Sequence, residues 1–248
     1  MTTFRLFILM DVPSNLFEEW ADWNSEHARD VVRDGHISGQ TFKVRTDFSY
    51  VHPELLEGRP PYTMVNAYEV DDATVEGRLT KKTPEMGQGP AVTTRPFPSP
   101  LGKHMGDGYL LEPVSEKFHG SSPNGDQLKY LLITLMEVPP ELSDEWTDWF
   151  VEHARDMVTA PGFLSGQTYR VRTDYSYIHP ESLPDRPPYT MVNVYEVDDR
   201  AVQTTLAGTP KTGGGPTVTK RPFPSPLGET RADTYLMEPI SERYCRAS

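Results

Sequence analysis

Two histidines occupy matching places in two similar stretches of the chain, and each is able to move a proton. His27 and His153 each lie in a predicted helix whose aromatic and apolar residues recur at steps of three and four. This spacing forms one face of an α-helix, so we expect each imidazole to point toward a sheet. Imidazole titrates near neutral pH, which suits a general acid or base; the alternative is a satisfied core histidine. The two stripes are Leu16, Trp20, Trp23, His27 and Val31, and Leu142, Trp146, Trp149, His153 and Met157.

Carboxylates follow both histidines but do not form a metal motif. Asp30 and Asp156 lie three residues after the histidines, where they can orient the ring or pair with a neighbouring arginine or solvent. No spacing typical of a metal site is present, so we expect no metal. The chain also lacks a GxGxxG sequence, a phosphate-binding loop with its lysine and a GxSxG elbow, so we expect no cofactor.

A long segment without an apolar period follows the second predicted strand of each stretch. Connections of this length are uncommon and are usually lids or binding loops, and the alternative is an arm that holds the other half of the chain. The segments run from Arg45 to Tyr62 and from Arg172 to Tyr189. Their candidate substrate-binding residues are Tyr50, His52 and Arg59, with Tyr177, His179 and Arg186 in the second segment.

Polar side chains also lie on the third predicted strand of each stretch. Alternation puts Asn66 and Tyr68 on one face of that strand and Glu69 on the other. Buried amide and phenol groups need partners, which a ligand pocket provides, and a tyrosine in an ordinary core is the alternative. Asn193 and Tyr195 are the corresponding candidates in the second stretch.

These residues recur because the chain is a tandem repeat. His153 follows His27 by 126 positions, and His179 follows His52 by 127. The longest shared segment is SGQTFKVRTDFSYVHPELLEGRPPYTMVNAYEVDD with SGQTYRVRTDYSYIHPESLPDRPPYTMVNVYEVDD, and RPFPSPLG occurs twice. We therefore predict a first repeat over residues 1–118, a polar linker over 119–127 and a second repeat over 128–248.

Each repeat reads as strand, helix, strand, strand, helix, strand. The predicted strands are 4–10, 40–45, 62–70 and 109–112 in the first repeat, and 129–136, 167–172, 189–197 and 235–238 in the second. Ser14 and Ser143 are predicted N-caps of the long helices, and the acidic pairs at 71–72 and 198–199 are predicted to cap the second helices. The order βαββαβ is the ferredoxin-like motif, an α+β fold. Two such sheets can cover each other, so we expect an intramolecular dimeric α/β-barrel.

The helix and the turn after it resemble the dimeric α/β-barrel superfamily, in particular its EthD-like branch. The residues that carry this resemblance are Trp23, His27 and Asp30 in the first repeat, and Trp149, His153, Asp156 and the Pro161-Gly162-Phe163 turn in the second. The first repeat departs from the pattern at the turn, where it reads Asp34-Gly35-His36-Ile37. The match covers most of both repeats, but its motif is short and indicates a fold better than a reaction.

The superfamily includes muconolactone isomerases, polyketide cyclases, cofactor-free monooxygenases and haem enzymes such as chlorite dismutases. The resemblance implies a pocket for a small aromatic or lactone-like molecule. With the histidines, it leads us to expect a cofactor-independent lyase, isomerase or cyclase in which His27 or His153 acts as general acid or base. The alternatives are a cofactor-free monooxygenase or haem enzyme, and a non-catalytic small-molecule-binding or stress-response protein.

The composition limits the classes of binding partner and the cellular compartment that we expect. The formal net charge is −12, and no basic run contradicts it, so nucleic acid and anionic membranes are not expected partners. The single cysteine, Cys245, lies in what reads as a frayed tail and fits a reducing cytoplasm. No apolar run approaches a membrane helix in length. We expect a cytoplasmic protein with a small-molecule substrate, and further pairing of fused chains into a homodimer is left open.

Overall fold

The computed structural model describes residues 2–48, 62–79, 92–98, 106–121, 130–175, 189–206, 218–224 and 232–247. The first half of the chain contains one long helix, short helical turns and strands in alternation. These elements are β1 (Thr3–Met10), η1 (Ser14–Leu16), α1 (Phe17–Arg33), β2 (Ser38–Val44), β3 (Met64–Asp71), α2 (Asp72–Thr74), η3 (Val75–Leu79), β4 (Asp107–Pro113) and β5 (Phe118–His119).

The second half repeats this order. Its elements are β6 (Tyr130–Met136), η4 (Pro140–Leu142), α3 (Ser143–Met157), β7 (Phe163–Val171), β8 (Met191–Val197), α4 (Asp199–Ala201), η5 (Val202–Leu206), β9 (Ala232–Pro239) and β10 (Tyr244–Cys245). The βαββαβ order predicted for each half is therefore present, with second helices of only a few described residues.

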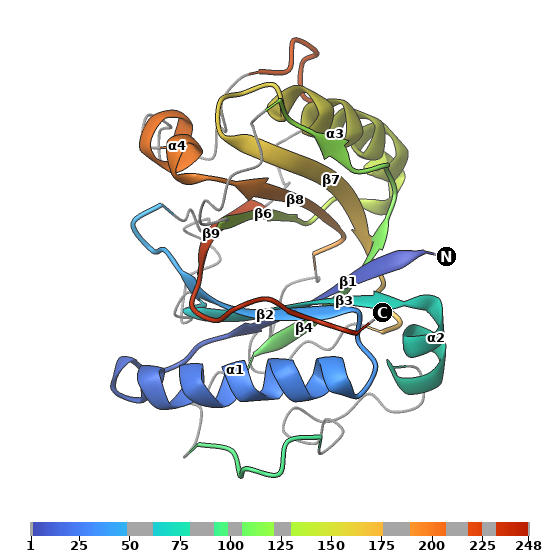
Figure 1. The fold of residues 1–248 in the computed structure, drawn as a ribbon. Coiled ribbons are helices and arrows are strands. Elements are labelled where there is room, and N and C mark those ends of the chain that lie inside the picture. The colour runs from blue at the N-terminus through green and yellow to red at the C-terminus, as the bar shows by residue number, and fades with distance from the viewer. Residues whose placement is uncertain are drawn as a thin grey trace.

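Antiparallel pairing joins the strands of both halves into one barrel. The first half has the strand order β2-β3-β1-β4 and the second has β7-β8-β6-β9. Between the halves, β4 pairs with β7 and β2 pairs with β9. Within the described residues, these pairings close a ring of eight strands. Figure 1 shows the two sheets facing each other, with α1 outside one and α3 outside the other.

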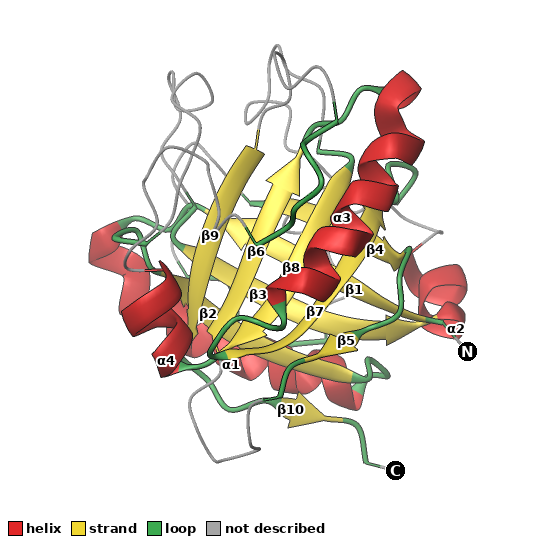
Figure 2. Ribbon diagram, turned by 90° about the horizontal axis from the view of Figure 1, so that it is seen from above, coloured by secondary structure: helices red, strands yellow, loops and turns green. Residues whose placement is uncertain are grey.

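The strand alternation divides the buried residues into two layers. On β3, Val65 and Ala67 belong to the apolar core inside the barrel, together with Phe7, Leu9 and Ile133. Met64 and Tyr68 instead pack with residues of α1 on the outer face of the sheet. A strand with one face in the barrel and the other under a helix is buried on both sides, as its burial pattern shows. Figure 2 shows α3 over the strands of the second half in the same way.

The N-caps predicted for the long helices are wrong. Ser14 begins the short turn η1, and α1 starts only at Phe17; Ser143 is the first residue of α3. Proline explains the difference, because the carbonyl of Pro13 accepts a hydrogen bond from the backbone N–H of Leu16 and a 3-10 turn forms first. The predicted acidic caps are confirmed. Asp71 Oδ1 accepts from the N–H of Thr74, and Asp198 Oδ1 accepts from that of Ala201.

Each half contributes one short strand that pairs with a strand of the other half. Phe118 and His119 form β5, which pairs with Gly166 and Ser165 of β7. Tyr244 and Cys245 form β10, which pairs with Gly39 and Ser38 of β2. His119 therefore belongs to a strand and not to the predicted linker, and the predicted frayed tail at Cys245 is wrong. An open strand edge binds an extended segment readily, so each half holds the terminal arm of the other.

Gly162 is a position where the fold requires glycine. Its φ is +84°, and a Cβ added there would lie 2.3 Å from the backbone nitrogen of Ala201 and 2.5 Å from Asp198 Oδ1. Both atoms belong to the capped start of α4, so neither can move without breaking the cap. The Pro-Gly turn therefore fixes the distance between the end of α3 and the start of α4.

We predict that Gly162→Ala destabilises the protein by about 2–5 kcal/mol, from backbone strain and overpacking together. Thermal unfolding followed by circular dichroism should show a midpoint lowered by at least about 5 °C. Gly77→Ala is the matched control, because an added Cβ there has no described atom within 4 Å. Equal midpoints for the two variants would contradict this account.

Candidate functional site

Five charged side chains meet at one end of the barrel. Arg5 of β1 places Nη2 3.3 Å from Glu69 of β3 and 3.5 Å from Glu196 of β8. Lys117 Nζ lies 2.9 Å from Glu196, and Arg243 Nη2 lies 2.7 Å from Glu69. Arg5 and Glu69 come from the first half and Glu196 from the second, so the cluster spans the junction between the halves.

Strand register brings these groups together. Arg5 lies directly opposite Glu69 in the pairing of β1 with β3. Leu131 lies opposite Glu196 in the equivalent pairing of β6 with β8. Glu196 therefore lacks a cationic neighbour on its own β6, and the long side chain of Arg5 reaches it from the other half. Lys117 and Arg243 arrive on the exchanged arms, next to β5 and β10.

Pairing keeps both carboxylates ionised. Burial alone would raise the pKa of Glu196, but Lys117 and Arg5 outweigh it and lower the pKa to about 2. Burial acts the same way on Glu69, and Arg5 and Arg243 lower its pKa. A buried charge is tolerated only when it is paired, and three cations share two carboxylates here. The cluster thus has one net positive charge.

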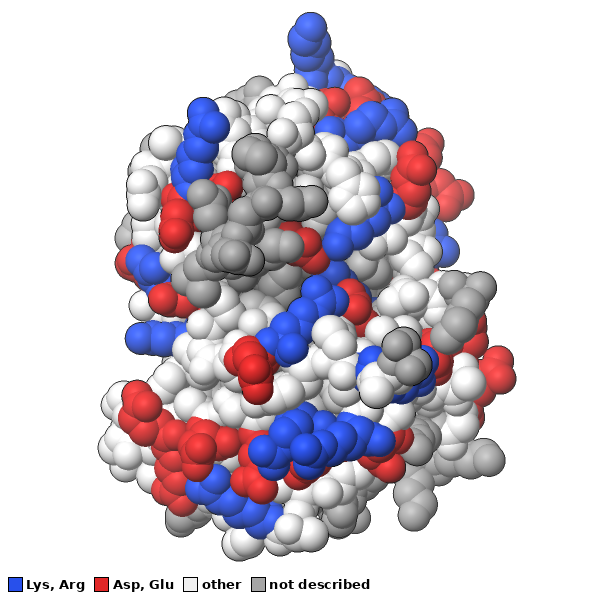
Figure 3. All heavy atoms as spheres, viewed as in Figure 1, with Lys and Arg blue, Asp and Glu red and all other residues white. Residues whose placement is uncertain are grey.

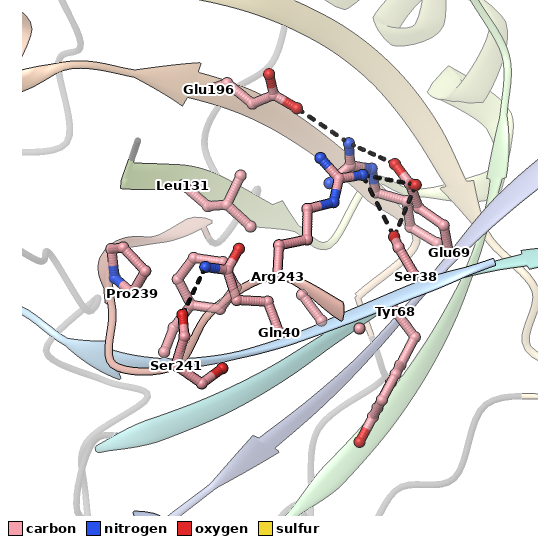
Figure 4. Close-up of a pocket in the computed structure, with 13 residues that line it drawn as sticks. Ser38, Gln40, Tyr68, Glu69, Leu131, Glu196, Pro239, Ser241 and Arg243 are labelled. Carbon is pink, nitrogen blue, oxygen red and sulfur yellow. Dashed lines mark hydrogen bonds and ion pairs between the residues drawn. The ribbon is translucent and has the colours of Figure 1, made fainter. Parts of the chain in front are cut away.

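A hollow of about 360 Å³ opens beside this cluster. Its floor is apolar and consists of Phe42, Ala67 and Leu131, while Arg5, Glu69 and Arg243 are among its charged lining. Figure 4 shows Leu131 and Pro239 facing Arg243 across the hollow. We call it the Leu131 pocket. Its size falls in the ~300–1,000 Å³ range of small-molecule sites, and its mixed lining is typical of them.

A second hollow of about 590 Å³ lies on the other side of Arg5 and includes Lys117, Gln167 and Tyr169. We call it the Tyr169 pocket. The Arg5 Nε–H donates to the Tyr169 hydroxyl at 3.2 Å, and that hydroxyl donates to Gln167 Oε1 at 2.7 Å. Burial raises the pKa of Tyr169, so the phenol stays protonated. On the face shown in Figure 3, acidic and basic side chains are mixed and do not form separate patches.

The predicted catalytic histidines lie away from both hollows. His27 stacks on Trp23 with 4.7 Å between ring centroids, and Phe97 stacks on the other side of Trp23 at 4.5 Å. His153, Trp149 and Phe223 repeat this arrangement at 4.7 and 4.5 Å. Figure 1 shows the segments 92–98 and 218–224 on the sides of α1 and α3 that face away from the barrel. The imidazoles thus contact a tryptophan of their own helix and a threonine of these segments, so the expectation that they point toward the sheet is wrong.

Hydrogen bonds fix the proton on the ring of His27. Its Nδ1 lies 3.0 Å from Thr93 Oγ1, and the Thr93 hydroxyl donates to Asp30 Oδ2 at 3.1 Å. Because that hydroxyl hydrogen points to Asp30, Nδ1 must be the donor and Nε2 carries the lone pair. His153 Nδ1 lies 2.9 Å from Thr219 Oγ1. Burial lowers the pKa of each histidine to about 4, with a small opposing effect of Asp30 and Asp156.

The strand candidates lie between sheet and helix. Asn66 Nδ2 donates to Asn24 Oδ1 of α1 at 2.6 Å, and Asn193 Nδ2 donates to the Tyr195 hydroxyl at 3.1 Å. Tyr68 borders the Leu131 pocket, but its ring turns away from it (Figure 4). Glu69 is on the opposite strand face, as predicted, and that face is the one that lines the barrel. The loop candidates Tyr50, His52, Arg59, Tyr177, His179 and Arg186 lie outside the described residues and stay predictions.

The charged cluster was not predicted, although one signal for it exists in the sequence. Arg5 interrupts the apolar run of the first strand at the position where the second repeat has Leu131. Where two otherwise similar halves differ at a buried position, the interactions made at that position must differ between them. Among the described residues, no group of three or more metal-ligating side chains is present, and no helix there is long and apolar enough to cross a membrane.

Comparison with known proteins identifies the fold. No protein-family model matches the sequence, and no curated protein matches it. An anthrone oxidase-like protein is 12% identical over 100% of this chain and 94% of its own, with a TM-score of 0.55. A candidate monooxygenase from Fusobacterium nucleatum is 10% identical over 99% of both chains at a TM-score of 0.48. Chlorite dismutase from Candidatus Nitrospira defluvii is 11% identical over 94% of this chain and 90% of its own, with a TM-score of 0.43. The first likeness supports the dimeric α/β-barrel fold.

The low pKa of the two helix histidines predicts acid sensitivity. Their folded pKa of about 4 lies below the ordinary value of 6.5, so the native state binds fewer protons than the unfolded state between these values. Their contribution is complete above pH 6.5 and is lost as pH falls toward 4. Between pH 7 and pH 5 we expect each histidine to remove about 2 kcal/mol from the free energy of unfolding.

Urea unfolding of the wild type and of His27→Asn/His153→Asn at pH 7 and pH 5 measures this loss. The double variant should lose about 4 kcal/mol less than the wild type over that interval, because asparagine does not titrate. The titration of Glu196 does not affect the comparison, because its depressed pKa changes the free energy of unfolding mainly below pH 4.5. Parallel pH dependences in the two proteins would show that the rings are not desolvated.

Proposed function

We propose that the Leu131 pocket is a ligand site and that the protein binds a compact organic molecule there. The observation that carries this proposal is the lining of the pocket. Phe42, Ala67 and Leu131 offer an apolar surface, and Arg5 and Arg243 stand at its polar side. Such a pocket buries the body of a small molecule while a few polar groups set its orientation.

The ionisation of the cluster supports binding and orientation in preference to proton transfer at this place. A carboxylate with a pKa of about 2, such as Glu196, is a weak base near neutral pH. The Arg5 guanidinium, buried among anions, keeps its proton. These groups supply fixed charges, which stabilise polar parts of a ligand without changing their own protonation.

A cofactor-independent lyase, isomerase or cyclase reaction is the second candidate, with His27 or His153 as the proton carrier. The observation that favours it is the chain from His27 through Thr93 to Asp30, which leaves the Nε2 lone pair as the basic site. Its pKa of about 4 makes it a weak base that is never blocked by protonation at neutral pH. A cofactor-free monooxygenase or haem enzyme is the other reaction class on this fold. A Soret band in the purified protein would select haem.

We also infer that the two halves pair as the subunits of a dimer do, within one chain. Supporting this, β1 pairs with β3 and β4 as β6 pairs with β8 and β9. The junctions β4–β7 and β2–β9 correspond to each other, as do the two exchanged arms.

Residues 128–248 expressed alone should therefore form a homodimer, because pairing two copies restores both junctions and both arms. Light scattering after size-exclusion chromatography gives the mass directly. A folded monomer of that half would contradict the inferred pairing, since its outer strands would then be stable without a partner.

Binding in the pocket can be tested with 2-naphthylmethanol, a neutral aromatic probe, by calorimetric titration. We expect Ala67→Phe to weaken binding at least tenfold, because the larger ring fills the floor of the pocket. His27→Asn/His153→Asn is the control and should bind as the wild type does. Retained binding in Ala67→Phe, or loss in the histidine variant, would place the ligand elsewhere.

A further inference from the structure

The two hollows at the charged end are copies of one site whose floors have diverged. Several residues that line the Leu131 pocket have the same residue type at the equivalent place in the Tyr169 pocket: Gln40 and Gln167, Pro239 and Pro113, Ser241 and Ser115. Their equivalence places an amide, a proline and a serine at the same points of each half. The arms contribute Arg243 to one copy and Lys117 to the other, which preserves the charge.

The floor differs at all three of its positions. Where the Leu131 pocket has Leu131, the equivalent residue is Arg5; where it has Phe42, the equivalent is Tyr169; and where it has Ala67, the equivalent is Val194. At each of these three positions the Leu131 pocket has the smaller or the more apolar side chain of the pair. In the other copy the corresponding space is crossed by Arg5, whose Nε–H donates to Tyr169.

Arg5 serves both copies at once. It is buried, with 8% of its surface exposed, and lines both hollows. In the Tyr169 pocket its guanidinium stands where the Leu131 pocket has an apolar floor, and it also presents its positive charge at the side of the Leu131 pocket. Arg243 stands on the rim of that pocket, bound to Glu69 and Ser38. Two cations, Arg5 and Arg243, and two carboxylates, Glu69 and Glu196, therefore border the apolar floor.

We propose that each chain binds one planar aromatic carboxylate, with its ring on Phe42 and Leu131 and its carboxylate directed to Arg5 and Arg243. This inference rests on the proposed ligand site and names the ligand class. Guanidinium groups bind carboxylates through well-aligned donors, which favours this head group over a neutral one.

The test compares 2-naphthoate with neutral 2-naphthylmethanol by calorimetric titration at pH 7 on the full chain. We expect one site per chain and at least tenfold tighter binding of the naphthoate. Arg243→Gln should weaken naphthoate binding about tenfold and leave the alcohol unchanged. Lys117→Gln, the equivalent change beside the Tyr169 pocket, should affect neither, and is the matched control.

A floor variant keeps the test independent of the charged groups. Phe42→Tyr/Ala67→Val gives the Leu131 pocket two residues that the other copy already houses, so the barrel should tolerate them, and it should weaken both probes. Two sites per chain, or equal effects of Arg243→Gln and Lys117→Gln, would overturn the single-site inference. Equal affinity for the two probes would overturn the proposed preference for a carboxylate head group but leave the proposed ligand site intact. Absence of binding by either probe would overturn both.

Discussion

The arrangement depends on one buried cation that two halves of the chain share. Arg5 leaves β1 of the first half and lies between Glu69 of its own half and Glu196 of the other. A buried guanidinium is costly unless anions surround it, and a buried carboxylate is costly unless a cation does. Each group therefore requires the others to be in place. These contacts therefore favour the relative position of the halves that brings all three charges together at this end of the barrel.

The exchanged arms reinforce this closure and connect it to the pocket. Arg243 precedes β10, which pairs with β2, and its guanidinium joins Glu69. Lys117 precedes β5, which pairs with β7, and its ammonium joins Glu196. Backbone pairing thus positions the two outer cations, while strand register positions the inner one. The apolar residues from Phe7 to Met237 fill the middle of the barrel, and the Leu131 pocket lies where charged side chains interrupt that core.

The sequence predicts the elements well because they depend on local periodicity. The alternation on β3 correctly separates Glu69 from Asn66 and Tyr68, and the acidic caps at Asp71 and Asp198 are found where expected. The alternation does not reveal which face looks into the barrel, because both faces are buried. The apolar stripe on the helix likewise predicts that the face carrying His27 is covered. It does not predict which segment covers that face, and in the structure Thr93 of segment 92–98, 66 positions away in the sequence, contacts the ring. Periodicity does not reveal the charged cluster either, because Arg5 meets Glu196 across the halves and the arms bring Lys117 and Arg243 to it.

The pocket and its neighbour differ because equivalent positions of the two halves carry different residues. In a symmetric dimer every substitution occurs at both sites, so a buried arginine at the position of Arg5 would face a second arginine across the axis. A fused chain removes this constraint, because Leu131 can change independently of Arg5. One arginine can then pair with both carboxylates, and a leucine in the equivalent place gives the Leu131 pocket part of its apolar floor. The asymmetry at this end of the barrel is thus possible because both halves belong to one chain, in which Arg5 and Leu131 are separate positions.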